Sequence, residues 1–229
     1  MTTSAGSESV SHSLRGLLIA QFCGAFNDNA WKLMVALLAI RQATAGLAPG
    51  PELETVAQTQ TAMAFVIFTL PLMLLSLVGG TLADRVSKRT VIISIKVVEV
   101  FLMAAGTFAL WLNPAGGVLP LIVLCGMGVH SALFSPSKYG ILPELVPHER
   151  LAAGNGLLEM WTFAAILTGT AAGGLLLQMA GDHTWLAPLA LTGLSVVGLV
   201  TAFTIPHVPP ARSAGGVGTT VRCAWEAIC

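Results

Sequence analysis

The chain has 229 residues, of which 55% are hydrophobic and only 10% are charged, and its formal net charge is zero. Soluble domains carry about 25% charged residues. This composition, with a mean hydropathy of +0.80, therefore excludes an ordinary soluble protein and predicts an integral membrane protein surrounded by membrane lipid. The zero net charge gives no basis for a nucleic-acid partner.

Six stretches along the chain are long and apolar enough to cross a bilayer, which requires about 20 mostly apolar residues. We expect all six to be helices, because the backbone finds no water to bond inside the hydrocarbon. The predicted fold class is an all-α membrane protein built as a six-transmembrane-helix bundle. The six stretches are 16–40, 60–83, 90–112, 118–137, 155–178 and 185–205.

The segments outside these stretches complete the predicted domain organisation. Residues 1–15 predict a cytoplasmic N-terminal segment, and residues 16–205 form the transmembrane domain. Residues 41–59, which include "GLAPGPELE", predict a flexible external loop. Residues 206–229 are rich in proline, glycine and small residues, so they predict a cytoplasmic loop or a truncated tail.

Basic residues set the predicted orientation of the bundle. If the N-terminus is cytoplasmic, eight of the arginines and lysines outside the apolar centres lie on the cytoplasmic side, and only Arg41 lies on the other. Six spans return the chain to the side on which it started, so both termini are predicted to be cytoplasmic. The eight are Arg15, Arg85, Lys88, Arg89, Lys138, Arg150, Arg212 and Arg222.

A polar cluster interrupts the first apolar stretch, in the sequence "CGAFNDNAWK" at 23–32. A charge at the bilayer centre costs about 2.5–3.5 kcal/mol, so such residues should face a bundle interior or a wet cavity. Asp28 and Lys32 are four residues apart and are predicted to share one helix face and to pair. With Asn27 and Asn29 they are candidates for a cavity that meets a polar substrate or a proton. The alternative is a buried pair that only locks helix packing.

Three further polar residues lie within the predicted spans. Lys96 and Glu99 are three apart near the cytoplasmic end of the third span, where we expect snorkelling and packing in preference to a substrate role. His130 stands alone in the fourth span, where a helix–helix contact is more common than a proton relay.

The fifth span combines a carboxylate with small residues. Gly169 and Gly173 form a small-xxx-small pair, which predicts close helix packing. Glu159 either lines the mouth of the cavity or ties down a loop.

Polar clusters in both the first and the fourth span also suggest two three-helix repeats.

Motifs that carry covalent chemistry are absent from the sequence. It contains no glycine-rich phosphate loop, no G-x-S-x-G elbow and no metal-ligand cluster. We therefore predict no enzyme activity, no catalytic residue, no metal site and no cofactor within these 229 residues.

The stretch "GGTLADRVSKRTV" at 79–91 resembles the signature of the major facilitator superfamily. Ser87 stands where the second glycine of that signature usually lies. The resemblance implies the N-terminal half of that fold and a gating role for the motif, and the alternative is an ordinary basic loop. Matching positions are Gly80, Leu82, Ala83, Asp84, Arg85, Lys88 and Arg89.

Two other stretches narrow the resemblance to the bacterial lysophospholipid transporters. They are "FCGAFNDNAWK" and "SPSKYGILPEL" followed by "GNGLLE", and the resemblance extends over about 15–205. It implies that the protein carries a lysophospholipid, chiefly lysophosphatidylethanolamine, across the bacterial inner membrane by alternating access. Asp28 and Lys32 would then contact the head group. Lys138 would meet a phosphate or anchor a loop.

Other functions are compatible with the same residues. A drug or metabolite exporter would keep the fold and change the cargo. The chain could also be the membrane-domain fragment of a fused acyltransferase and acyl-carrier-protein synthetase, or a membrane scaffold without transport. Because the resemblance covers one half of a two-half transporter, we expect either a truncated chain lacking its C-terminal six-helix half or a second copy that replaces that half.

Overall fold

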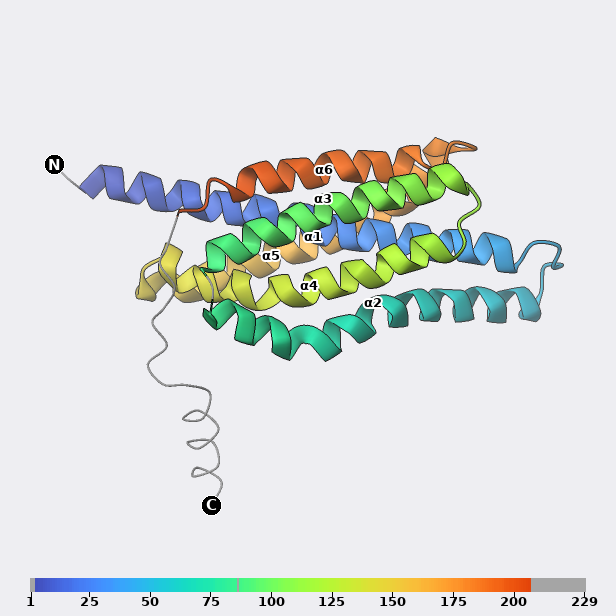
Figure 1. Cartoon of the computed structure of the whole chain (residues 1–229), viewed down its shortest axis with the longest axis horizontal. Coiled ribbons are helices and arrows are strands. Elements are labelled where there is room, and N and C mark those ends of the chain that lie inside the picture. Colours follow the sequence, from blue (N-terminus) through green and yellow to red (C-terminus); the bar gives the residue numbers. More distant parts are fainter. Residues whose placement is uncertain (1–2, 86, 207–229) are drawn as a thin grey trace, which may run out of the picture.

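A computed structural model describes the backbone of residues 3–85 and 87–206 and the side chains of 14–76 and 87–206. Six long helices lie side by side in one bundle, and successive helices run in opposite directions (Figure 1). The predicted all-α, six-helix fold class is therefore confirmed. The elements are α1 (Thr3–Ala43), α2 (Pro51–Arg85), α3 (Lys88–Leu112), α4 (Val118–Leu145), a short 3-10 helix η1 (His148–Arg150), α5 (Leu151–Ala180) and α6 (Leu186–Ala202).

The helices extend beyond most of the apolar stretches. The expected flexible loop at 41–59 was wrong over much of its length, because α2 begins at Pro51. Proline is favoured at the first helical position, and Glu52 and Glu54 place negative charge at the helix N-terminus. The helix α4 continues past the end at 137 that was predicted for the fourth span, and both Pro136 and Pro143 lie inside it. Lys138 therefore lies within a helix and not in a cytoplasmic loop.

Length and composition support the membrane location for most of the bundle. Among the residues with described side chains, four helical stretches are long and apolar enough to span a bilayer, at Pro51–Ser76, Lys88–Leu112, Val118–Leu145 and His148–Ala180. The helix α6 is shorter and also apolar. The polar cluster at 23–32 interrupts the apolar sequence of α1, but the helix itself is continuous and lies within the bundle (Figure 1).

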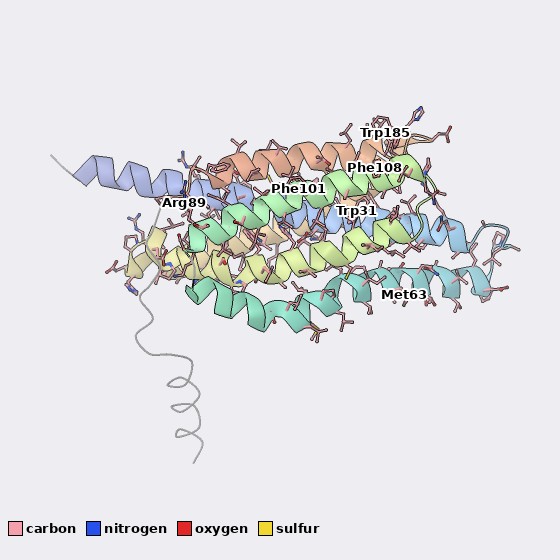
Figure 2. All side chains as sticks on the ribbon, in the orientation of Figure 1. Trp31, Met63, Arg89, Phe101, Phe108 and Trp185 are labelled. Carbon is pink, nitrogen blue, oxygen red and sulfur yellow. The ribbon has the colours of Figure 1, made fainter. Side chains whose placement is uncertain are left out.

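The outer surface of the bundle is apolar, as expected of a protein in lipid. Phe101 is 70% exposed, and Phe108 and Met63 are also exposed, whereas Trp31 is fully buried (Figure 2). Meanwhile Lys96 and Glu99 are completely buried inside the bundle. This arrangement agrees with apolar side chains facing lipid and charged side chains facing the interior of the bundle.

The pairing of the helices agrees with two three-helix repeats. The most extensive contacts are α1 with α5 and α2 with α4, which are equivalent pairs if α1–α3 correspond to α4–α6. Close approach of α5 to α1 depends on the predicted glycine pair. A Cβ added at Gly169 or Gly173 would lie 2.5 Å from the carbonyl oxygen of Phe26 or Ala30, respectively. The predicted close packing at this pair is thus confirmed.

Candidate functional site

A cavity of about 250 Å³ lies among α1, α2, α4 and α5. Its wall on α1 is formed by residues at helical spacing, beginning with Gln21, whose side chain donates to Thr162 Oγ1 on α5 at 2.9 Å. Four of the six predicted substrate-binding residues line this cavity. The lining residues are Gln21, Gly24, Ala25, Asp28, Asn29, Lys32, Phe68, Leu72, His130, Ser131, Phe134, Ser135, Lys138, Thr162 and Ile166.

Asp28 provides a buried acceptor on the α1 side of the cavity. Its Oδ2 accepts a hydrogen bond from Ser131 Oγ on α4 at 2.5 Å. Its Oδ1 is buried and has no hydrogen-bond partner among the residues with described side chains. The carboxylate is therefore held in place by one oxygen while the other keeps its capacity to accept.

Lys32 does not form the predicted ion pair with Asp28. Its ammonium donates to Asn29 Oδ1 at 3.0 Å and lies 4.8 and 4.7 Å from the ring centroids of Phe65 and Phe68. The pairing expectation was wrong because these two α2 rings and the neighbouring amide stabilise the ammonium in another position. Both charges nevertheless lie on the same cavity wall.

Lys138 and Glu159 lie close together, but only Lys138 lines the cavity. The Lys138 side chain is largely buried, and its ammonium lies 4.8 Å from the Tyr139 ring centroid. The Tyr139 hydroxyl donates to Glu159 Oε1. Glu159 therefore links α5 to α4 beside the cavity.

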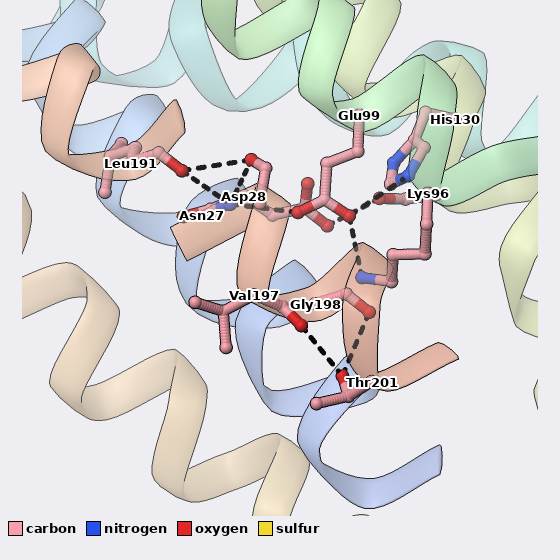
Figure 3. Close-up of polar contacts among 11 residues, drawn as sticks. Asn27, Asp28, Lys96, Glu99, His130, Leu191, Val197, Gly198 and Thr201 are labelled. Carbon is pink, nitrogen blue, oxygen red and sulfur yellow. Dashed lines mark hydrogen bonds and ion pairs between the residues drawn. The ribbon is translucent and has the colours of Figure 1, made fainter. Parts of the chain in front are cut away.

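Asn27 faces away from the cavity, into what we call the buried charge network, formed by Asn27, Lys96, Glu99, His130 and Ser195 (Figure 3). Glu99 accepts from Lys96 Nζ at 2.7 Å and from Asn27 Nδ2 at 2.9 Å. The Asn27 amide nitrogen also lies 2.8 Å from Ser195 Oγ on α6. The snorkelling expectation for Lys96 was wrong, because its charge is neutralised deep inside the bundle and does not reach the interface.

Glycine makes room for the buried ammonium of Lys96. A Cβ added at Gly24 would lie only 2.6 Å from Lys96 Nζ. The ammonium also lies 5.1 Å from the centroid of the Phe134 ring. The position of Lys96 between helices thus depends on a residue that also lines the cavity.

His130 connects the buried charge network to the cavity. Its Nε2 is 3.5 Å from Glu99 Oε2, and its ring is parallel to Phe134 with centroids 6.4 Å apart. It also lines the cavity, together with its neighbour Ser131. Neither residue was among the predicted cavity residues, although both precede the "SPSK" stretch by only one turn of helix.

The predicted gating motif is described only in part. Gly80, Asp84 and Arg85 lie outside the residues with described side chains. Lys88 pairs with Glu144 at 2.5 Å, at the C-terminal end of α4.

Arg89, in the first turn of α3, contacts the C-terminal end of α6. Its Nε and Nη2 donate to the carbonyl oxygens of Ile205 at 2.6 Å and Phe203 at 3.2 Å. A guanidinium group there satisfies carbonyls that have no partner within the helix. The two basic residues therefore hold α3, α4 and α6 together at the end of the bundle where α1 begins (Figure 1).

Charged side chains around a cavity inside an apolar helical bundle are typical of membrane transport proteins. The sequence profile of the Major Facilitator Superfamily matches residues 17–229, and the chain belongs to that superfamily.

Several curated bacterial proteins are similar to the chain. It is 33% identical over 222 residues to the lysophospholipid transporter LplT of Escherichia fergusonii, covering 96% of this chain and 50% of that protein. It is 35% identical over 204 residues to LplT of Klebsiella pneumoniae subsp. pneumoniae, covering 88% and 45%. The chain thus spans about half the length of the curated relatives it matches.

A solved structure supports the fold independently. The crystal structure of a POT family transporter in complex with 5-aminolevulinic acid superimposes with a TM-score of 0.60. The match covers 94% of this chain and 44% of the other, at 18% identity. At this identity the likeness concerns the fold alone.

Proposed function

We propose that the chain forms the N-terminal half of a carrier that moves lysophospholipids across the bacterial inner membrane by alternating access. The observation that carries this proposal is the joint presence of Asp28, Lys32 and Lys138 around one cavity of an apolar helical bundle. A zwitterionic phosphoethanolamine head group offers the complementary charges. The similarity to proteins named as lysophospholipid transporters supports the choice of cargo.

In this proposal, opposite charges of the head group contact different side chains. Asp28 Oδ1, which is buried and has no partner within the described residues, accepts from the ammonium group. Lys138 and Lys32 stabilise the phosphate, with Asn29 orienting Lys32. Charge-assisted hydrogen bonds of this kind are the stronger class in proteins.

Two predicted binding residues take supporting roles here. Asn27 holds α1 against α3 and α6 through Glu99 and Ser195. Glu159 fixes Tyr139 beside Lys138. Both positions keep the cavity walls in place without contacting the cargo.

The acyl chain requires an apolar path beside the head group. Phe68 and Leu72 on α2 and Ile166 on α5 form an apolar part of the same cavity wall. Burial of a methylene group contributes about 0.8 kcal/mol. We propose that the first methylenes of the acyl chain lie along these side chains.

Alternating access requires a counterpart for this half. We propose that a C-terminal six-helix half, or a second copy of the chain, closes on the end that holds Gly80, Asp84, Arg85, Lys88 and Arg89. With both termini cytoplasmic, this end faces the cytoplasm. Rocking of one half against the other around a fixed site is the established mode of such folds.

Replacing Asp28 with asparagine tests the proposed function. We expect uptake of radiolabelled lysophosphatidylethanolamine by spheroplasts that express the full gene product to fall at least about tenfold, because one charge-assisted hydrogen bond contributes about 1.5–3 kcal/mol. Lys32→Ala should lower uptake in the same direction. Glu54→Gln removes one carboxylate from an exposed position on α2 and should leave uptake unchanged.

The outcomes distinguish a wrong assignment of the cargo from a wrong assignment of the binding site. No lysophospholipid uptake by the parent protein, with uptake or export of another solute, would exclude the proposed cargo. Parent-level uptake by Asp28→Asn at equal membrane abundance would exclude the proposed site.

A further inference from the structure

We infer, on the basis of the proposed function, that His130 is a further cargo-contacting residue that donates a hydrogen bond to the phosphate of the head group. Its ring belongs to the cavity wall and to the buried charge network at the same time.

The hydrogen-bonding capacity of the His130 ring is unused. The residue is 3% exposed, and neither Nδ1 nor Nε2 has a hydrogen-bond partner within the described part of the chain. An imidazole carries at least one N–H. A buried donor without a partner is unfavourable, so a ligand that accepts from it gains binding free energy.

The surroundings of His130 hold its ring in place. Phe134 lies parallel to the ring on α4, and Glu99 Oε2 lies 3.5 Å from Nε2 on α3. Glu99 is itself held by Lys96 and Asn27, so its carboxylate cannot turn away. The ring is therefore held between α3 and α4.

The charged groups around His130 divide between the helices. Asp28 and Lys32 face the cavity from α1, Lys96 and Glu99 lie on α3, and Lys138 lies two turns further along α4. The described cavity residues contributed by α2 and α5 carry no charge.

The cavity therefore offers both donors and an acceptor. His130 and Lys138 on α4 and Lys32 on α1 are donors, and Asp28 on α1 is the acceptor. This combination fits a phosphate and an ammonium group in one ligand.

Two substitutions at position 130 distinguish donation from packing. His130→Phe keeps a flat ring beside Phe134 and removes the donor, whereas His130→Gln keeps an N–H donor. We expect the Phe variant to bind lysophosphatidylethanolamine at least about tenfold more weakly than the parent chain, and the Gln variant about threefold more weakly. His183→Gln changes an exposed histidine between α5 and α6. The affinity of this variant for lysophosphatidylethanolamine should stay within twofold of that of the parent chain.

Binding is measured on the purified 229-residue chain in lipid nanodiscs, with radiolabelled lysophosphatidylethanolamine as the probe. The imidazole ¹⁵N resonances of the same sample report on His130 directly. We expect the resonance that disappears in His130→Phe to shift when lysophosphatidylethanolamine is added, and to stay in place when a lysolipid without phosphate, monoacylglycerol, is added.

The two proposals fail in different ways. Parent-like binding by His130→Phe, together with loss of binding by Asp28→Asn, would overturn the role of His130 and leave the proposed function intact. Absence of binding by the parent chain would overturn both. If His130→Phe does not fold, the His130 resonance is identified by its absence from His130→Gln, and a resonance that stays in place in the parent chain on lysolipid addition overturns the inference.

Discussion

Replacing Glu99 with leucine is expected to destabilise the bundle by about 3–5 kcal/mol, because the ammonium of Lys96 would remain buried without its counter-charge. Both side chains are fully buried, so solvent does not screen the remaining charge. Asn27 would also lose an acceptor for its amide. Unfolding of the purified protein in mixed detergent and lipid micelles, followed by circular dichroism, measures the change.

The double variant Lys96→Met/Glu99→Leu is the control for this prediction. Removing both charges leaves no buried unpaired ion, so at least half of the lost stability should return. A single Glu99→Leu variant as stable as the parent would show that water reaches Lys96. A double variant as unstable as the single one would assign the effect to packing.

Replacing Gly169 and Gly173 together with alanine should separate α5 from α1. Each new methyl group would lie 2.5 Å from a backbone carbonyl oxygen of α1, and backbone atoms cannot turn aside as a flexible side chain can. Overpacking of this kind costs about 1–3 kcal/mol per site. The same unfolding measurement should show a loss of several kcal/mol for the pair.

Gly174 supplies a matched control on the same helix. A Cβ there would meet only Leu33 and Leu37 side-chain carbons at 3.6 and 3.9 Å, which is ordinary contact. Gly174→Ala should therefore be neutral or slightly stabilising, since alanine is the better helix former. Equal losses at Gly173 and Gly174 would contradict the proposed close approach.

Local patterns predicted the fold and much of one cavity wall. Apolar stretches of sufficient length predicted the helices, and helical spacing placed Asp28 and Lys32 on one face. The close packing at the glycine pair on α5 could also be predicted, because small residues four apart commonly allow two membrane helices to approach closely. Each of these features depends on residues close together in the sequence.

Contacts between distant segments could not be predicted in this way. Asn27 joins Glu99 and Ser195, which lie 72 and 168 residues further along the chain. Helical spacing alone does not reveal these partners, so the same pattern allowed Lys96 to snorkel. The position of Lys32 depends on Phe65 and Phe68 of another helix, which a pairing rule within α1 does not include.

Cysteine accessibility tests the central claim most directly, namely that Asp28 and Lys32 face a hydrated cavity while Asn27 lies in the dry interior. The chain has four native cysteines, which are first replaced by alanine. Single substitutions Asn27→Cys, Asp28→Cys and Lys32→Cys are then treated in membranes with a water-soluble, impermeant thiosulfonate. We predict rapid modification at 28 and 32 and none at 27; no modification at 28 and 32, or equal modification at all three, would contradict the account.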